Sequence, residues 1–454
     1  MNKDLTIGKP GKTLILFTIP LFISVIFQQM YNMADSIIAG KFAGTDALAA
    51  VGASYPITML FMAVAIGSQI GTSVVISNYF GAKNYSMLKT TISTTAIAGF
   101  VLSLILTIFG VLCSPLFIKF LNTPDNIFND SNLYLQIYTG GFIFLFLYNI
   151  TTGIFNSLGD SKTPLYLLIA SSVSNIILDY IFVRYCHLAV AGVAYATFIC
   201  QGIACIVSLI LLAIRFRKIK EPNYQKFSKK ALAEVCKLAI PSILQQSFIS
   251  IGNLFIQLMV NNYSSDVIAG YSAAIKINTF AVTTFTTLGN GVSNFTAQNL
   301  GSLKIKRIKK GFISGLGFSL LIAVIFSLIF TLFSKELVNV FMEDDNSVDT
   351  DLALSTGKEF LMVVAPFYIS VATKLICYGI LRGSNNMLYF MIATFTDLIL
   401  RVILAFVFMQ FFGTLGIWMG WPISWIIATI MSFIFYKSNI WLKKYRDLEF
   451  SDEI

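Results

Sequence analysis

Long apolar segments recur from one end of this 454-residue chain to the other. Several exceed about 18 residues, the length that lets an α-helix cross the hydrocarbon core of a bilayer. Apolar residues make up 56% of the chain and charged residues 12%, and the mean hydropathy is +0.77. Soluble domains carry roughly twice that share of charge. We therefore predict an all-α membrane protein that crosses the bilayer many times, with no room for a soluble catalytic domain.

Twelve apolar segments can be drawn as transmembrane helices. They cover 14–39, 49–80, 91–112, 131–156, 165–184, 190–214, 239–262, 267–299, 312–333, 360–381, 388–411 and 416–436. The connection 214–237 carries eight basic and two acidic residues, whereas 334–359 carries seven acidic residues and two lysines. Because basic connections stay on the cytoplasmic side, this bias predicts that both termini are cytoplasmic. The basic connections thus report topology, and we expect no nucleic-acid partner.

Sequence features of the first half recur in the second half at a nearly constant spacing. Pro20 recurs as Pro241 (241 − 20 = 221), and Gly81 recurs as Gly301 (301 − 81 = 220). Each half contains six predicted spans in the same orientation, so we expect two parallel six-helix repeats related by an axis along the membrane normal. The predicted domains are an N-lobe (1–214), a cytoplasmic linker (215–238), a C-lobe (239–437) and a cytoplasmic tail (438–454). Proline-interrupted helices at matching positions are typical of the moving parts of transporters, so both prolines are predicted hinges.

The first predicted span carries a polar stripe that ends in a carboxylate. Gln28, Tyr31 and Asp35 follow Pro20 at spacings that place them on one face of a helix. An ionisable side chain in hydrocarbon costs several kcal/mol, so Asp35 is expected to face a wet cavity or a partner and to be functional. The alternative is that Asp35 lies at the end of the span and contacts lipid headgroups.

The two halves differ at the residues that would carry charge inside the membrane. Asn175 and Asp179 in the fifth span correspond to Asp397 and Arg401 (397 − 175 = 222). Asp397 and Arg401 have the spacing of an intrahelical salt bridge, so that pair is expected to be structural. Asp179 has only the amide of Asn175 at this spacing, and an amide can hydrogen-bond a carboxyl group in either protonation state.

Asp35, Asn175 and Asp179 are therefore predicted to form an ion-coupling site. Two carboxylates desolvated close together titrate as a pair and can share a proton or a small cation. Other polar residues of the first half are predicted to line the same cavity and to bind substrate: Gln28, Tyr31, Asn149, Thr152, Asn156, Thr197 and Gln201. The alternative is a buried hydrogen-bond network that only joins helices.

Residues for metal or covalent chemistry are scarce. His187 is the single histidine, and the six cysteines form no CxxC pair. We therefore predict that the chain is not an enzyme and has no catalytic residues, no resident metal and no cofactor. The one metal ion to consider is a coupling Na⁺ held by Asp35, Asn175 and Asp179.

The chain resembles the multidrug and toxic compound extrusion (MATE) family over essentially its whole length. The matching motifs are Pro20…Gln28…Tyr31…Asp35, Gly44…Ala47-Leu48-Ala49-Ala50-Val51-Gly52, Gly81, Leu158-Gly159-Asp160-Ser161-Lys162-Thr163-Pro164, Asn175-xxx-Asp179 and Arg382-Gly383. The resemblance implies two six-helix bundles of the MOP superfamily around a central cavity. It also implies export of organic cations against an inward flow of H⁺ or Na⁺. Acids on the first and fifth spans match the DinF-like branch of the family, although the second-half motif that begins at Arg382 lacks the usual Asp.

The resulting prediction is a multidrug antiporter of the bacterial inner membrane, a monomer whose partners are small organic cations and the lipid bilayer. A lipid-linked oligosaccharide flippase of related architecture is the alternative, but it would carry a ring of cavity arginines and only Arg401 lies mid-span. A channel or a structural membrane protein is disfavoured by the paired prolines and the intramembrane acids. Lys276 and Lys374 also lie within apparent spans, where each can bind an anionic group, pair with a carboxylate or extend to a wet cavity.

Overall fold

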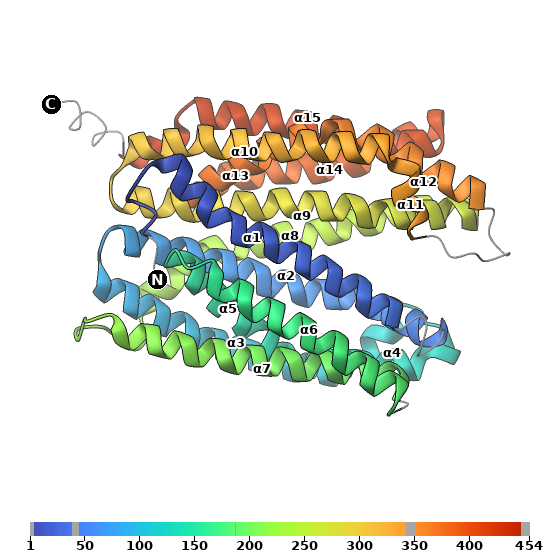
Figure 1. The fold of residues 1–454 in the computed structure, drawn as a ribbon, viewed down its shortest axis with the longest axis horizontal. Coiled ribbons are helices and arrows are strands. Elements are labelled where there is room, and N and C mark those ends of the chain that lie inside the picture. Colours follow the sequence, from blue (N-terminus) through green and yellow to red (C-terminus); the bar gives the residue numbers. More distant parts are fainter. Residues whose placement is uncertain (1–3, 39–44, 187, 342–349, 446–454) are drawn as a thin grey trace. The chain divides into compact units, whose positions relative to one another are not determined.

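A computed structural model of the chain describes residues 4–38, 45–186, 188–341 and 350–445 (Figure 1). All regular secondary structure in these residues is helical. The chain divides into two compact units: unit 1 is Met1–Asp4 with Ile19–Ser247, and unit 2 is Leu5–Thr18 with Phe248–Ile454. The predicted lobes share most of their residues with these units. The start of the first helix, however, belongs to unit 2, and the start of the first helix after the linker belongs to unit 1.

Unit 1 contains the later part of α1 (Pro10–Ile38) and the earlier part of α8 (Lys229–Val260). Its other helices are α2 (Thr45–Gly81), α3 (Tyr85–Phe120), α4 (Asp125–Gly140), α5 (Phe142–Ser157), α6 (Lys162–Arg184) and α7 (Ala189–Lys218).

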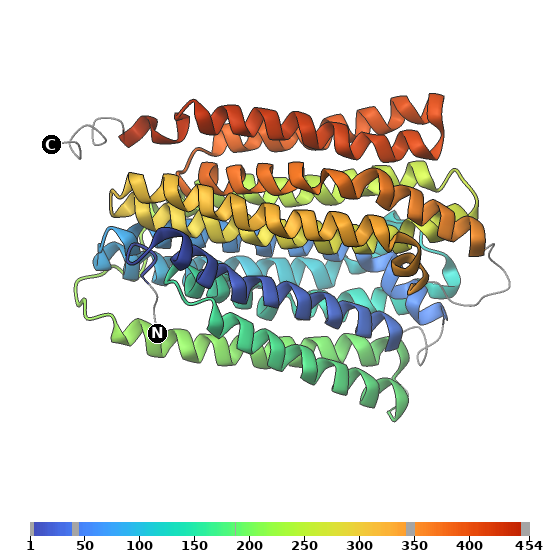
Figure 2. The same cartoon turned by 45° about the horizontal axis from the view of Figure 1, so that its top comes forward.

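Unit 2 contains the start of α1 and the later part of α8. Its other helices are α9 (Ser265–Gly301), α10 (Ile305–Leu332), α11 (Ser334–Asn339), α12 (Thr350–Val364), η2 (Ala365–Phe367), α13 (Tyr368–Gly383), α14 (Met387–Phe412), α15 (Thr414–Lys437) and η3 (Ile440–Tyr445). Within this unit α14 and α15 run side by side, as both views show (Figure 2).

All twelve predicted spans have a helical counterpart, with three differences in detail. The predicted span 360–381 consists of the end of α12, the short 3₁₀-helix η2 and most of α13. Within the described residues ten helices are long and apolar enough to cross a membrane, and the bent pair α4–α5 brings the number to eleven. That pair meets at an angle of 43° at Gly141, inside the predicted continuous span 131–156. The remaining helix, α9, is 37 residues long, but it carries many Asn, Thr, Gln and Ser side chains and is less apolar than the others.

The turns of the two halves repeat as the helices do. Lys83 (φ 55°) and Leu303 (φ 60°) both adopt the left-handed backbone conformation that non-glycine residues rarely adopt. They lie 303 − 83 = 220 positions apart, which is the spacing of the predicted repeat. The connections predicted at 81–90 and 300–311 are thus tight turns between α2 and α3 and between α9 and α10.

Small residues let helices approach closely within each unit. In unit 2 a Cβ added at Gly379 on α13 would lie 2.5 Å from the carbonyl oxygen of Gly289 on α9. In unit 1 a Cβ added at Gly71 on α2 would lie 2.6 Å from the backbone nitrogen of Ala239 on α8. These glycines therefore set the distance between their helices, as small residues commonly do in membrane proteins.

In unit 2 the residues that precede α1, here called the N-terminal strap (5–8), are bound by α9 and α10. The guanidinium group of Arg307 donates hydrogen bonds to the carbonyl oxygens of Leu5 at 3.1 Å and Ile7 at 3.3 Å. The backbone N–H of Leu5 donates to Oε1 of Gln298 at 2.9 Å. The strap backbone, which forms no helix or sheet, thus obtains its hydrogen-bond partners from side chains.

Unit 1 binds the residues that precede α8, here called the linker strap (219–228), in the same way. Nζ of Lys89 on α3 donates to the carbonyl oxygen of Glu221 at 2.9 Å. Oγ1 of Thr94, further along the same helix, accepts from the backbone N–H of Ser228 at 3.0 Å. The two straps are therefore equivalent features of the two halves. The ends of the predicted linker (215–238) belong to α7 and α8, and its middle part is the linker strap.

Replacing Arg307 with alanine should loosen the N-terminal strap, because several charge-assisted hydrogen bonds disappear at once. We expect amide hydrogen exchange of residues 5–8 to become roughly tenfold faster, which corresponds to about 1.4 kcal/mol. The matched control is Lys310→Ala, at an exposed position of α10, which should leave the exchange unchanged. Equal exchange in R307A and in the wild-type protein would show that other contacts hold the strap.

Candidate functional site

Asp179 and Asn175 lie one turn apart on α6 and are buried within unit 1. Asp179 is 0% exposed and Asn175 is 3% exposed. In the amide orientation that satisfies both of its polar atoms, Asn175 donates to Oδ2 of Asp179 at 2.8 Å and accepts from the backbone N–H of Thr197 at 3.2 Å. A carboxyl group inside a spanning helix is therefore bound by a neutral amide, and that amide is in turn fixed by α7.

Asp160 holds the start of α6 in place. Its Oδ1 accepts from the backbone N–H of Thr163, in the first turn of α6, at 3.1 Å. Its Oδ2 forms an ion pair of 2.7 Å with Arg215 on α7. In the sequence Asp160 is visible only as part of a motif. The structure shows that it joins the start of α6 to α7, the two helices that carry Asn175 and Thr197.

A small pocket in unit 1 lies between α4, α5 and α7. Thr197 and Gln201 line it, together with the rings of Tyr134, Tyr138 and Phe198. Oε1 of Gln201 is buried and has no hydrogen-bond partner among the described residues. Aromatic walls attract cations through the electron-rich faces of the rings. The backbone N–H of Thr197 donates to Asn175, so the pocket adjoins the Asn175–Asp179 pair.

The three predicted cavity residues of α5 lie elsewhere in unit 1. Asn149 donates to the carbonyl oxygen of Leu145 in its own helix at 2.8 Å. Asn156 is buried, and its Oδ1 has no hydrogen-bond partner within the described part of the chain. The side chains of Asn149, Thr152 and Asn156, all of them described, do not line the pocket that contains Thr197 and Gln201. The structure thus divides the predicted cavity residues into two groups.

The predicted residues of α1 are described only in part. Gln28 is exposed and Tyr31 is half-buried on this helix. The side chain of Asp35 lies outside the described residues, so its approach to Asp179 and a Na⁺ site between them stay predictions. Among the side chains that are described, no group of three or more His, Cys, Asp or Glu could hold a metal ion.

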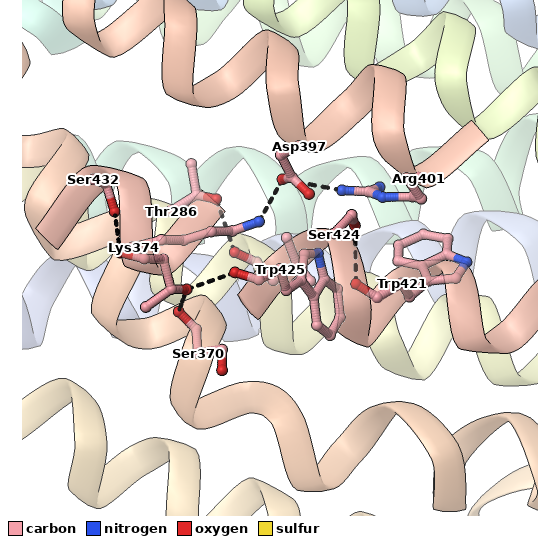
Figure 3. Close-up of polar contacts among 11 residues, drawn as sticks. Thr286, Ser370, Lys374, Asp397, Arg401, Trp421, Ser424, Trp425 and Ser432 are labelled. Carbon is pink, nitrogen blue, oxygen red and sulfur yellow. Dashed lines mark hydrogen bonds and ion pairs between the residues drawn. The ribbon is translucent and has the colours of Figure 1, made fainter. Parts of the chain in front are cut away.

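Unit 2 contains a second buried charged group, here called the charge cluster, formed by Lys374, Asp397 and Arg401 (Figure 3). Arg401 Nη2 lies 3.3 Å from Oδ2 of Asp397, which confirms the predicted intrahelical salt bridge of α14. Lys374 on α13 donates to the same oxygen, so this lysine pairs with a carboxylate of its own unit. The ring of Trp421 lies 4.3 Å from the guanidinium carbon of Arg401, and the ring of Trp425 lies 5.5 Å from Nζ of Lys374.

Lys276, the other lysine within a predicted span, differs from Lys374. It is exposed on α9, and its Nζ lies 5.7 Å from the centre of the Phe341 ring. The two lysines that looked alike in sequence are thus distinct, one ion-paired and buried and the other exposed.

The aromatic wall of the pocket in unit 1 was not predicted from the sequence. Tyr134 and Tyr138 lie four residues apart on α4 with their ring centres 6.3 Å apart, stacked on one face of the helix. That spacing was visible in the sequence. Phe198 carried no such signal, because it is one of 41 phenylalanines and its contact with Phe144 depends on how α5 packs on α7.

The MatE family model matches residues 20–181 and 241–407, which is more than half of the chain. The two matched segments begin 241 − 20 = 221 positions apart, the spacing predicted for the repeat. The chain belongs to the MatE family. Members of this family are membrane transporters and not enzymes. The two halves of this MatE protein are therefore the two repeats that the duplicated prolines indicated.

Curated relatives and solved structures agree with this assignment. The chain is 27% identical to the "probable multidrug resistance protein YoeA" of Bacillus subtilis, over 96% of each sequence. It is 24% identical to the "probable multidrug resistance protein NorM" of Thermotoga maritima, over 95% of this chain and 93% of the relative. A solved "outward-facing conformation of a multidrug resistance MATE family transporter of the MOP superfamily" matches 97% of this chain and 98% of its own, with a TM-score of 0.90 at 20% identity. That structure supports the fold, an all-helical membrane transporter fold.

Replacing Asn175 with leucine should destabilise unit 1, because the change removes the hydrogen bonds to Asp179 and Thr197 at nearly constant side-chain volume. We expect a loss of about 1 kcal/mol, in the range of hydrogen bonds between helices in membranes. The measurement is thermal unfolding of the purified protein in detergent. Asn149→Leu is the control, since its amide donates only to its own helix, and an equal effect of the two changes would contradict the prediction.

Proposed function

We propose that this MatE transporter exports amphipathic organic cations from the bacterial cytoplasm, in exchange for H⁺ or Na⁺. The two relatives named above are designated multidrug resistance proteins, which supports drug export. The observation that carries the coupling part is the buried Asn175–Asp179 pair next to an aromatic pocket. The inner membrane, with both termini cytoplasmic, is the location consistent with the basic connections.

The coupling ion is proposed to bind at Asp35, Asn175 and Asp179, the pattern of the DinF-like branch. A carboxylate inside the membrane can attract either a cationic drug or a small cation, and the two then compete for one charge. Asn175 can hydrogen-bond Asp179 both before and after protonation, because its amide group both donates and accepts. One charge that moves through about 100 mV supplies roughly 2.3 kcal/mol for this exchange.

The proposed cycle begins with drug bound in the outward-facing state beside the pocket lined by Thr197 and Gln201. Arrival of H⁺ or Na⁺ at Asp35 and Asp179 cancels the charge that held the drug. Drug then leaves, α1 bends at Pro20, and the protein returns to its inward-facing state. Contacts with aromatic rings depend little on the details of shape, so the proposed site would accept several cations and not one defined substrate.

Asp35→Asn and Asp179→Asn should each abolish cation-driven efflux, because neither amide can exchange a proton or neutralise a cation. The measurement is efflux of ethidium from proteoliposomes, with H⁺ and Na⁺ gradients imposed in separate experiments. Asp351→Asn, at an exposed position near the start of α12, is the control and should transport normally. Wild-type efflux by both D35N and D179N would refute the coupling site, and the gradient that drives the wild-type protein identifies the ion.

Pro20→Ala should slow transport without preventing drug binding. Alanine restores the backbone N–H that proline lacks, so α1 can form a hydrogen bond to the carbonyl of Leu16 and becomes harder to bend. Ethidium binding followed by fluorescence and efflux from proteoliposomes separate the two steps. Wild-type turnover by P20A would remove bending at Pro20 from the mechanism.

A further inference from the structure

The charge cluster of unit 2 places two cations and one anion inside spanning helices (Figure 3). Lys374 and Asp397 are each 4% exposed, and Arg401 is 6% exposed. Oδ2 of Asp397 faces both cations, so one carboxylate serves two positive groups. With Lys374 protonated the cluster therefore carries a net charge of +1, and with Lys374 neutral it carries none.

The neighbours of Lys374 do not supply a second negative charge. The groups that interact with Lys374 are Asp397 and Arg401 on α14 and Trp425 on α15. The titratable side chains next to this cluster are Tyr378 on α13 and Tyr271 on α9, both neutral phenols. Among the described residues Asp397 is the acid that contacts Lys374, and the other attractive contact of its ammonium group is with the face of the Trp425 ring. A net charge inside a membrane is costly unless water, a partner or a change of protonation removes it.

Of the three groups, Lys374 is the one that can lose its charge without leaving another charge unpaired. Arginine stays protonated in proteins, so Arg401 keeps its charge. Protonation of Asp397 would leave two cations without a counter-ion, which is worse than the starting state. Loss of the proton from Lys374 leaves the neutral Asp397–Arg401 pair intact on α14. Lysine is also the basic side chain that changes its protonation most readily when buried.

We propose that Lys374 is a second proton-binding site of this transporter, which releases its proton to water in one state of the cycle and regains it in another. The proton leaves from Nζ and returns to Nζ, so no other reactant is needed. The charge of the cluster then alternates between +1 and 0 in unit 2. This site is independent of the ion-coupling site proposed for unit 1, because it uses none of its residues.

The protonation of Lys374 acts on a contact between helices. Protonated Lys374 ties α13 to Asp397 of α14, whereas the Asp397–Arg401 pair lies within α14 alone. Loss of the proton thus weakens the link between α13 and α14 and leaves the structure of α14 unchanged. Trp425 on α15 lies against Lys374, so the fluorescence of the Trp425 ring should respond to the charge of the lysine.

The test uses this ring as an intrinsic reporter and needs no transported ligand. Tryptophan emission of the purified protein in lipid nanodiscs is recorded from mildly acid to mildly alkaline pH. We expect the wild-type protein to show a titration step, because the charge next to Trp425 changes. The step should be lost in Lys374→Arg, whose side chain stays charged, and in Lys374→Met, whose side chain has no charge.

Two further variants separate this site from the rest of the protein. Lys276→Met, which removes the exposed lysine of α9, should keep the step, and so should D179N, which alters the site of unit 1. A step that persists in both Lys374 variants, or a wild-type protein with no step, would overturn the proposal. Should Lys374→Arg not fold, Lys374→Met alone decides the test, because it leaves the Asp397–Arg401 pair complete.

The role in transport is tested by the pH dependence of ethidium efflux. In K374M, we expect ethidium efflux no longer to change with pH in the range where the wild-type fluorescence step occurs. In K374R, we expect efflux to be lost, because the charge at this position is permanent. A wild-type pH profile in both variants would overturn the participation of Lys374 in the cycle. Failure of D179N to transport, by contrast, bears only on the site of unit 1, because the fluorescence step is read in the absence of transport.

Discussion

The cost of charge inside hydrocarbon determines how both units use their polar residues. An ionised side chain in the bilayer needs a partner or water. On α14 of unit 2, Asp397 obtains that partner from Arg401 one turn away and from Lys374 on α13. On α6 of unit 1 the matching positions hold Asn175 and Asp179, where an amide binds the carboxyl group. The polar pair thus occupies the same place in both repeats but differs in charge. It is a neutral ion pair in unit 2 and a single acid with an amide in unit 1.

This difference gives the two units distinct electrostatic characters at equivalent helices. The pair in unit 1 has a net negative charge when Asp179 is ionised, as the proposed binding of a cation requires. The charge cluster of unit 2 has a net positive charge when Lys374 is protonated. A neutral state is reached in unit 1 by gaining a proton and in unit 2 by losing one. In the two proposals, protonation therefore neutralises the site of unit 1 and gives the site of unit 2 a net positive charge.

The fold was largely predictable because the strongest signals are local or repeated along the chain. Apolar length predicted the helices, and the spacing of Pro20 and Pro241 predicted the duplication that the MatE matches confirm. The intrahelical bridge between Asp397 and Arg401 followed from a spacing of four residues. The bend at Gly141 did not follow, since the apolar pattern continues through it and gives no sign of a break. Contacts between helices were not predictable either, because they depend on the relative register of two helices. Lys374 contacts Asp397 only because α13 and α14 pack with these two residues at the same level. That relative position of the two helices cannot be read from the spacing of residues along the chain.

The straps explain how α1 can serve both units. α1 begins in unit 2, where Arg307 and Gln298 hold its N-terminal strap, and it passes into unit 1 at Ile19, next to Pro20. α8 crosses in the opposite sense, from unit 1 to unit 2 after Ser247, a few residues beyond Pro241. Each crossing helix thus has a proline near its crossing, where one backbone hydrogen bond is missing and the cost of bending is lower. The strap contacts precede Pro20, so a bend there leaves them intact. The start of α1 belongs to unit 2, and the later part of the helix belongs to unit 1.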